Sequence, residues 1–228
     1  NVAEHMGVSR QAQDEWGVRS QNRAEAAQAR GFFEREISPY TLPDGTVVST
    51  DDGIRPGTTY EKVSQLSPVF RPDGTVTAGN ACPLNDGAAA VVVMSDTRAA
   101  ELGIKPLARI ISSGVSALSP EIMGLGPIQA IRQALGRAGM TPDDIDLFEI
   151  NEAFAAQVLP SADEIGIDLD KLNVNGGAIA LGHPFGMTGA RIMTTLLNGL
   201  EDTDGEFGVE SMCVGGGQGM AMVVQRLR

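Results

Sequence analysis

Three short stretches combine a polar or nucleophilic side chain with glycine or with the end of an apolar run. The first is Asn151-Glu152-Ala153-Phe154-Ala155-Ala156, directly after the apolar run 147–150. A strand-to-helix junction here exposes polar side chains and unpaired backbone N–H groups at one point. Asn151 is therefore a candidate hydrogen-bonding residue of a site. The alternative is that Asn151 only caps a helix and that Phe154 only fills the core.

The second stretch is Gly176-Gly177-Ala178-Ile179-Ala180-Leu181-Gly182-His183-Pro184-Phe185-Gly186, which contains one of the two histidines of the chain. Its glycines allow the backbone to approach a ligand closely and to adopt positive φ. Pro184 restricts the backbone beside the imidazole. Such loops seldom need a histidine for packing, so His183 is a candidate catalytic residue, with a purely structural histidine as the alternative.

The third stretch is Cys213-Val214-Gly215-Gly216-Gly217-Gln218-Gly219. A cysteine at the end of a strand that opens into a glycine-rich turn is placed to face a cavity. Its reference pKa of about 8.5 lies near enough to neutrality for general acid–base chemistry once it is tuned. The alternative for Cys213 is a buried structural cysteine next to a hairpin turn.

The elements that position these stretches follow from periodicity and from turn signals. In the first part of the chain we predict a helix over 9–29 capped by Ser9 and stopped by Gly31, followed by a loop-rich region over 41–80 with short strands and one helical turn. We then predict a strand over 88–94 buried on both faces, a helix from Ser95 to Gly103, a strand over 107–113 and a helix from Pro127 to Gly139. In the last part we predict a strand over 147–150, helical residues after Asn151, a short strand near 173–175, a helix over 190–200, and a hairpin of 208–213 with 220–227. Strands that alternate with helices predict a layered α/β domain from about residue 85 onward.

The composition restricts the class of protein. Among 228 residues, 42% are hydrophobic and 20% are charged, which is typical of a globular protein. The net charge of -12 argues against a nucleic-acid partner. No apolar run approaches the roughly 18 residues of a membrane helix. Two cysteines exclude a disulfide scaffold and indicate a reduced, cytoplasmic protein. A start at Asn1 predicts that an upstream segment is missing.

Taken together and in this order, the three stretches resemble the three C-terminal signatures of the thiolase family. Thr77-Ala78-Gly79-Asn80-Ala81, Asn85-Asp86-Gly87-Ala88-Ala89 and Met123-Gly124-Leu125-Gly126-Pro127 also match, so the resemblance spans essentially all 228 residues. It implies an α/β protein with the layered αβαβα fold of thiolases. Within that fold, 1–84 would be the loop domain that covers coenzyme A, 85–105 the last strand and helix of the N-terminal half, and 106–228 the C-terminal domain.

The resemblance also implies roles for four residues. Thiolases use a nucleophilic cysteine, which would lie in a half that this chain lacks. His183 would activate that thiol and donate a hydrogen bond to a thioester oxygen, and Asn151 would hold the water that completes this oxyanion hole. Cys213 would act as the second acid/base. The backbone N–H of Gly215 would contribute to a second oxyanion hole.

Seven further positions match those that line the coenzyme A site of the family: Arg55, Ala78, Cys82, Leu84, Met123, Ala153 and Phe154. Coenzyme A or acyl-CoA would be a substrate, and neither a permanently bound cofactor nor a metal is expected. Two departures stand out: Cys82-Pro83 replaces the Ser-Gly often found in the family, and Met187-Thr188 replaces a smaller pair after His-Pro-x-Gly. We expect neither departure to touch the acid/base set.

The implied activity is that of an acyl-CoA C-acyltransferase in fatty acid and lipid metabolism, cytoplasmic and assembled as a homodimer or homotetramer. It would catalyse reversible thiolytic cleavage of 3-ketoacyl-CoA, or Claisen condensation of acetyl-CoA, together with the upstream half that bears the nucleophile. A decarboxylating ketosynthase is disfavoured, because that class carries a histidine where Asn151 stands and lacks the cysteine at 213. A non-catalytic thiolase-like subunit that binds acyl-CoA or lipid remains the alternative.

Overall fold

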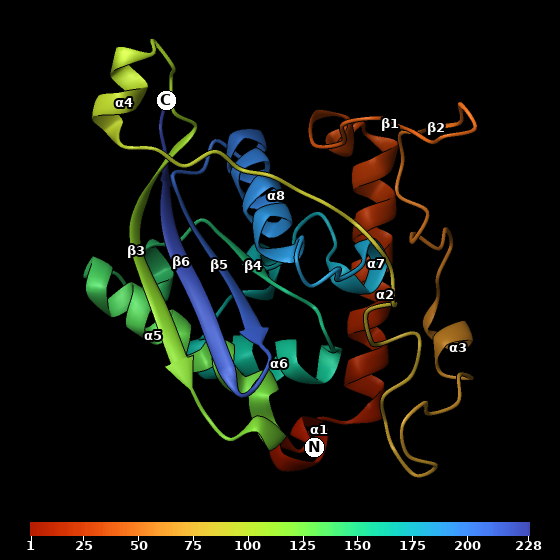
Figure 1. The fold of residues 1–228 in the computed structure, drawn as a ribbon. Helices are drawn as coiled ribbons and strands as arrows, with labels where there is room; N and C mark the ends of the chain where they lie inside the picture. Colours follow the sequence, from red (N-terminus) through yellow and green to blue (C-terminus); the bar gives the residue numbers. More distant parts are fainter.

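The computed structural model describes all residues 1–228, and a four-stranded sheet forms its centre (Figure 1). The strands are β3 (Ala108–Ala117), β4 (Leu147–Ile150), β5 (Phe207–Val214) and β6 (Gln218–Arg226). Their order is β3-β6-β5-β4, with β4 parallel to β5 and the other two pairs antiparallel. Because β4 and β5 run the same way, their carboxyl ends meet at one edge of the sheet.

Helices cover both faces of this sheet (Figure 1). α5 (Gly126–Ala138) and α6 (Ala155–Ile165) lie on one face, and α8 (Thr188–Asp202) lies on the other. Neighbouring residues of a strand point to opposite faces. Val223 accordingly packs in the cluster with α5 and α6, whereas Val224 packs against leucines of α8. The predicted layered α/β arrangement is therefore confirmed.

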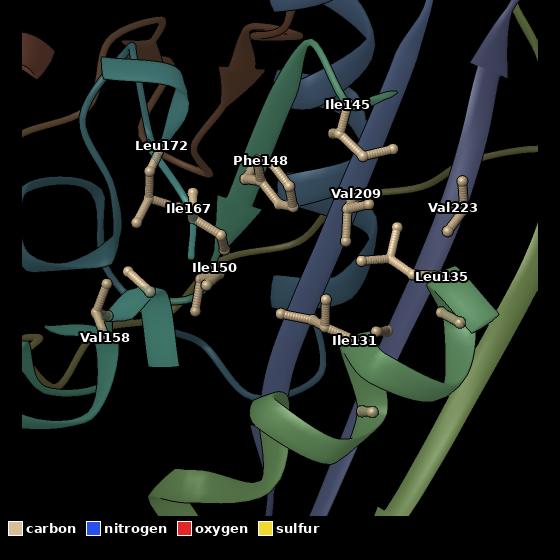
Figure 2. Packing of buried hydrophobic residues seen from close by; sticks show 14 of the residues in the cluster. Ile131, Leu135, Ile145, Phe148, Ile150, Val158, Ile167, Leu172, Val209 and Val223 are labelled. Carbon is tan, nitrogen blue, oxygen red and sulfur yellow. The ribbon is translucent and has the colours of Figure 1, made fainter. Parts of the chain in front are cut away.

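The larger core cluster fills the space between the sheet and the pair α5 and α6. Figure 2 shows its side chains meeting from β4, β5, β6, α5 and α6, among them Ile131, Leu135, Phe148, Ile150, Val158, Val209 and Val223. Burying an aliphatic or aromatic side chain of this size stabilises the fold by about 1.5–3 kcal/mol. The cluster thus fixes β4 and α6, the two elements that flank Asn151.

The long helix α2 (Arg10–Ala29) begins after Ser9, whose Oγ accepts a hydrogen bond from the backbone N–H of Ala12 at 3.1 Å. This confirms the predicted cap. The remaining elements are α1 (Val2–Met6), η1 (Phe32–Arg35), β1 (Tyr40–Thr41), β2 (Val47–Val48), α3 (Tyr60–Val63), α4 (Asp96–Glu101), η2 (Pro120–Leu125), η3 (Pro142–Asp144), η4 (Leu169–Lys171) and α7 (Ala178–Leu181). No helix in the structure has both the length and the apolar character needed to span a bilayer.

Two predicted strands are wrong. Residues 88–94 form no strand and make no backbone hydrogen bond; Val92 and Val93 are 84% and 70% exposed instead of buried. A strand requires a neighbour that supplies donors and acceptors, and this run pairs with no other strand of the chain. Near 173–175 the backbone makes only isolated bridges, from Leu172 to Phe148 and from Val174 to Gly176.

Two carboxyl groups face each other on the side of the sheet that α8 covers. Glu149 of β4 and Glu210 of β5 are register partners. Burial raises the pKa of Glu149 to about 8 and that of Glu210 to about 8, and the positive charge of Arg191 on α8 only partly opposes this. The guanidinium nitrogens of Arg191 are themselves buried without a hydrogen-bond partner in the chain. Both carboxyl groups are therefore mainly protonated at neutral pH.

The free energy of unfolding is consequently expected to fall as the pH rises from about 5 to about 8. The pKa of both groups is higher in the folded protein than the ordinary value of 4.5, so the folded state binds more protons in this window. The stability linked to these protons is complete below the ordinary value and is lost as the pH passes the folded-state value. The slope is about 1.4 kcal/mol per pH unit for each group.

Urea unfolding at steps of one pH unit measures this slope. Glu149→Gln removes one of the two titrating groups and is therefore expected to reduce the slope by about 1.4 kcal/mol per pH unit. Glu164→Gln is the matched control, because Glu164 lies at the surface in an ion pair with Arg132 at 2.9 Å. An identical slope in the wild type and in Glu149→Gln would contradict the prediction.

Candidate active site

Asn151 stands where β4 ends, beside the end of β5. Its backbone N–H donates to the carbonyl of Ser211 at 2.9 Å, which continues the parallel pairing of the two strands by one residue. The Asn151 side chain is 1% exposed, and neither its amide nitrogen nor its amide oxygen has a hydrogen-bond partner in the chain. A buried amide with both functions free is costly unless a ligand or a water engages it, which favours a site over a simple helix cap.

Cys213 lies two residues beyond Ser211 on β5, opposite Gly219 of β6. The side chain is buried, and burial raises the pKa of the thiol to about 11; the nearby Cys82 adds to this increase. At neutral pH the Cys213 side chain is therefore an uncharged thiol, which is the form that donates a proton. Cys213 and Asn151 thus share the edge of the sheet where β4 and β5 end.

Gly215 follows in the exposed turn between β5 and β6. Its backbone N–H donates to no other group of the chain. A Cβ added at Gly215 would meet nothing within 4 Å, whereas a Cβ at Gly217 would lie 2.2 Å from the carbonyl oxygen of Leu118. The turn is thus anchored at Gly217 and leaves the N–H of Gly215 free to donate.

His183 is held by its backbone between α7 and α8. The preceding Gly182 has a φ of 90°, and a Cβ there would lie 2.1 Å from the amide nitrogen of Asn85. The same Asn85 accepts a hydrogen bond from the backbone N–H of His183 at 3.1 Å. Only glycine fits this position without strain. Asn85 therefore joins the segment before residues 88–94 to the loop that carries the imidazole.

The ring of His183 is fixed by Thr188, the first residue of α8. Its Nδ1 lies 2.6 Å from Oγ1 of Thr188, and that hydroxyl donates to the carbonyl of Pro184 at 3.0 Å. When the hydroxyl donates to Pro184, its oxygen accepts from Nδ1, and the neutral imidazole then carries its proton on Nδ1 and a free lone pair on Nε2. Burial, followed by the charge of Arg191, lowers the pKa of His183, which favours this neutral form.

The contact corrects one expectation: Thr188 belongs to the Met187-Thr188 pair, and it does touch His183, one of the predicted acid/base residues. The sequence contains a signal for the contact between Thr188 and His183, because a residue with a hydroxyl group stands at the start of the helix that follows the His-Pro turn. Its partner becomes identifiable only once the turn folds back on the imidazole.

Thr188→Val is expected to change the ratio of the two neutral tautomers of His183, because valine keeps the shape of threonine and lacks the hydroxyl that bonds Nδ1. Losing one such hydrogen bond is worth about 1 kcal/mol, or roughly a fivefold change in the ratio of the two tautomers. Imidazole ¹⁵N chemical shifts measure the ratio, and the exposed His5, the only other histidine, is an internal reference. Thr188→Ser should keep the wild-type ratio; the same loss in both variants would argue against the assignment.

Three of the seven positions predicted to line coenzyme A come together. The backbone N–H of Cys82 donates to the carbonyl of Ala153 at 3.1 Å, and Ala81 forms an isolated bridge with Phe154. The ring of Phe154 packs edge-on against Phe70, with centroids 6.1 Å apart. Cys82, Ala153 and Phe154 therefore form one wall immediately after Asn151. Burial raises the pKa of the Cys82 thiol.

The other four positions are more dispersed. Met123 is half-buried in η2, which packs against β5 and β6. Arg55 and Ala78 are exposed, and the guanidinium of Arg55 bonds the carbonyl of Asp52 at 2.9 Å. Leu84 is 99% exposed, so this chain gives it no neighbour in the site. No group of three His, Cys, Asp or Glu side chains is arranged to hold a metal ion.

Comparison with known proteins identifies the family. Residues 104–226 match the family model described as "Thiolase, C-terminal domain", and residues 1–97 match "Thiolase, N-terminal domain". The chain is 52% identical over 230 residues to the acetyl-CoA acetyltransferase of Cupriavidus necator, covering 99% of this chain and 58% of that protein. It is 52% identical over 229 residues to the 3-ketoacyl-CoA thiolase of Cronobacter sakazakii, covering 97% of this chain and 59% of that protein.

Comparison with solved structures identifies the same family. The crystal structure of the Bacillus anthracis acetyl-CoA acetyltransferase superposes with a TM-score of 0.97 at 45% identity, covering 100% of this chain and 58% of that one. Human mitochondrial 3-ketoacyl-CoA thiolase in complex with CoA superposes with a TM-score of 0.93 at 43% identity, covering 100% and 57%. The chain thus spans less than two thirds of these proteins. On its sequence matches and its fold, this chain belongs to the thiolase family.

Proposed function

We propose that the chain is the C-terminal part of an acyl-CoA C-acyltransferase that cleaves 3-ketoacyl-CoA by thiolysis and, in reverse, condenses acetyl-CoA. The observation that carries the proposal is the edge of the sheet where β4 and β5 end. A protonated Cys213 thiol and an unpartnered Asn151 amide both belong to this edge, and His183 lies in the turn before α8 with its Nδ1 hydrogen-bonded to Thr188. The nucleophilic cysteine lies outside these residues.

In the first half-reaction, Nε2 of His183 accepts the proton of that nucleophilic thiol. The resulting thiolate attacks the ketone carbon of 3-ketoacyl-CoA, and the bond between C2 and C3 breaks. Cys213 donates its proton to the acetyl-CoA enolate that departs, which leaves an acyl-enzyme. In the second half-reaction, the thiol of coenzyme A gives its proton to the Cys213 thiolate, and the coenzyme A thiolate attacks the acyl-enzyme. The thioester bond to the enzyme breaks, and His183 returns its proton to the departing enzyme thiolate, which restores both groups. Splitting the acyl transfer in this way replaces one difficult step with two easier ones.

Negative charge develops on oxygen in both half-reactions, and two sets of donors would stabilise it. We assign one to His183 together with a water held by Asn151, and the other to the free backbone N–H of Gly215. Loss of a single oxyanion donor typically costs about 100- to 1000-fold in rate. A buried, preorganised amide such as that of Asn151 is suited to this role because it needs no reorganisation when the charge appears.

For coenzyme A we propose the wall of Cys82, Ala153 and Phe154, with Met123 on the acyl side and Arg55, Ala78 and Leu84 along the path of the cofactor. The human mitochondrial relative was solved in complex with CoA, which supports a coenzyme A site in this family. The proposed domains are a loop domain over 1–84, a final N-terminal piece over 85–105 and a C-terminal domain over 106–228. A homodimer or homotetramer in the cytoplasm, active in fatty acid metabolism, completes the proposal.

A non-catalytic acyl-CoA- or lipid-binding subunit is the second candidate. It is favoured by one observation: Cys82, Ala153 and Phe154 come together as a wall, and binding an acyl-CoA there requires no nucleophile. Retention of Asn151, His183 and Cys213 together favours the enzyme, because binding alone does not require proton transfer.

Intact-mass spectrometry of the native protein, before and after incubation with acetoacetyl-CoA, tests the proposal. An increase in mass by one acetyl group, on a longer chain or on a co-purifying polypeptide, is the expected result. Turnover of acetoacetyl-CoA with coenzyme A should accompany it. No adduct on any species, with no turnover, would refute the enzyme and leave the binding subunit.

A further inference from the structure

Glu152 is a fully buried carboxylate beside Asn151, and the proposed chemistry gives it no role. Four donors surround it. Its Oε1 accepts from Nε1 of Trp16 at 3.0 Å and from the amide of Asn173 at 2.9 Å. Its Oε2 accepts from the hydroxyl of Ser20 at 2.5 Å and from the backbone N–H of Ile179 at 3.2 Å. Each carboxylate oxygen thus receives two hydrogen bonds, which matches the acceptor capacity of an ionised carboxylate.

The four donors come from three separate parts of the chain. Trp16 and Ser20 are one turn apart on α2, and they therefore point to the same side of that helix. Ile179 lies in α7, four residues before His183. Asn173 also bonds both the N–H and the carbonyl of Ile150, each at 2.9 Å. One carboxylate therefore links α2, the end of β4 and the short helix that leads to the imidazole.

The backbone packs tightly around the carboxylate of Glu152. A Cβ added at Gly177 would lie 2.2 Å from Cδ of Glu152, so the backbone before α7 packs directly on the carboxylate. The N–H of Gly177 donates to the hydroxyl of Ser20 at 3.1 Å, which ties the same loop to α2 a second time. Burial raises the pKa of Glu152, while the donors from Ser20, Asn173 and Ile179 oppose that increase. The donors thus offset part of the cost of burying the charge.

We propose that Glu152 is a positioning residue that fixes His183 and Asn151 relative to each other and to α2. Its consequence for catalysis rests on the function proposed above. The same helix also contacts the segment that leads to the proposed coenzyme A wall, because the amide of Asn80, two residues before Cys82, donates to Asp14 of α2 at 2.8 Å. Through Glu152, α2 therefore sets the distance between the cofactor and the acid/base groups.

The substitution Glu152→Gln isolates this role, because glutamine has nearly the same volume and exchanges one acceptor for an NH2 donor. Placed at Oε2, the NH2 faces the N–H of Ile179, so α7 loses its anchor. Placed at Oε1, it faces Trp16 and Asn173, so the anchor at β4 is lost. Ser20→Ala is a milder second variant, which removes one donor and leaves the carboxylate in place.

The test uses the complete protein that includes the nucleophile-bearing part, and it follows the alkylation of that nucleophilic thiol by iodoacetamide across pH. The rate reports the thiolate that His183 generates, without any turnover. Glu152→Gln is expected to lower the rate at neutral pH about 10-fold and to move the profile to higher pH. In thiolysis, kcat should fall on the order of 10- to 100-fold with little change in KM for the acyl-CoA, because misplacement by about 1 Å has effects of this size.

Two controls separate positioning from stability. Ile131→Val removes one methyl from the core cluster and leaves all four donors to Glu152 in place, and it should lower Tm with a wild-type alkylation profile. The surface substitution Glu164→Gln should change neither Tm nor the pH profile of alkylation. Ser20→Ala should shift the alkylation profile in the same direction as Glu152→Gln, by less.

Wild-type alkylation profiles in Glu152→Gln and Ser20→Ala would overturn the proposal, even if Tm falls. If Glu152→Gln does not fold, Ser20→Ala decides alone: a shifted profile supports the positioning role, and an unshifted profile refutes it. Absence of thiolysis by the wild type would refute the proposed function instead, and the alkylation comparison would still decide the role of Glu152.

Discussion

Replacing Cys213 with alanine in the complete enzyme is expected to leave transfer of an acetyl group from acetyl-CoA to the nucleophile nearly unchanged, and to slow condensation by about 100- to 10,000-fold, the usual range for a lost acid/base group. In the proposed mechanism the two effects differ because acetylation breaks only a thioester bond, whose thiolate leaving group needs little help from an acid. Condensation additionally requires a proton to leave carbon, and we propose Cys213 as the group that accepts it.

The buried thiol makes this prediction specific. Because burial raises the pKa of Cys213 to about 11, the thiol is a proton donor at neutral pH, and it can act as a base only after its proton has passed to the coenzyme A thiolate released during acetylation. Cys213→Ser replaces the thiol with a hydroxyl of similar size that is a much weaker acid. Its activity should therefore lie between those of the wild type and Cys213→Ala. Acetyl adducts measured by mass spectrometry, set against condensation rates on the same samples, separate the steps.

Equal loss of acetylation and of condensation in Cys213→Ala would contradict this division of roles. Normal condensation by the variant would remove Cys213 from the reaction altogether. The melting temperature should be compared with that of the wild type, because the small cavity left by the sulfur costs about 1 kcal/mol and should not unfold the protein.

Replacing His183 with alanine is expected to abolish the acetylation step itself, with a loss of about 1000-fold or more. The ring has two proposed tasks, because Nε2 first accepts the proton of the nucleophile and then donates to the thioester oxygen. General base catalysis contributes about 100- to 10,000-fold and an oxyanion donor about 100- to 1000-fold. The effects of groups that act together are not additive, so the observed loss should be smaller than the product.

His183→Asn is the matched variant, because its amide NH2 can donate to an oxyanion but cannot act as a base. It should acetylate faster than His183→Ala at alkaline pH, where the nucleophile ionises without help, and both should be slow at neutral pH. Rates measured as burst amplitudes of acetyl adduct across pH provide the test. An acetylation rate for His183→Ala equal to that of the wild type would exclude His183 as the activating base.

Much of the local structure was predictable because its causes are local. The cap of Ser9 on α2, the start of α5 at Pro127 with its end at Gly139, and the hairpin of β5 and β6 depend on residues a few positions apart. The three stretches that contain Asn151, His183 and Cys213 were also recognisable, since their composition and order resemble one family. In each case the chemical reason lies within about ten residues of the feature.

Two predictions failed where distant groups decide the outcome. The β-branched run 88–94 has the composition of a buried strand, yet a strand exists only where another strand supplies its hydrogen bonds. The Met187-Thr188 pair was expected to be neutral for the site, but Thr188 bonds the imidazole at 2.6 Å. In both cases the sequence indicated a residue type correctly, and the geometry of a second segment determined its role.

The sequence by itself determined the class of chemistry, because a thiol, an imidazole and an amide next to glycine-rich turns are visible as residue types in a fixed order. Only the tertiary structure decided how these groups are held. Parallel pairing of β4 with β5 brings Asn151 beside the end of the strand that carries Cys213, and Thr188 bonds the imidazole of His183. Glu152 collects donors from α2, Asn173 and α7, which lie as far as 136 residues away along the chain. Hydrogen bonds act over about 3 Å in space, whatever the separation in sequence, so contacts of this kind appear only once the chain has folded.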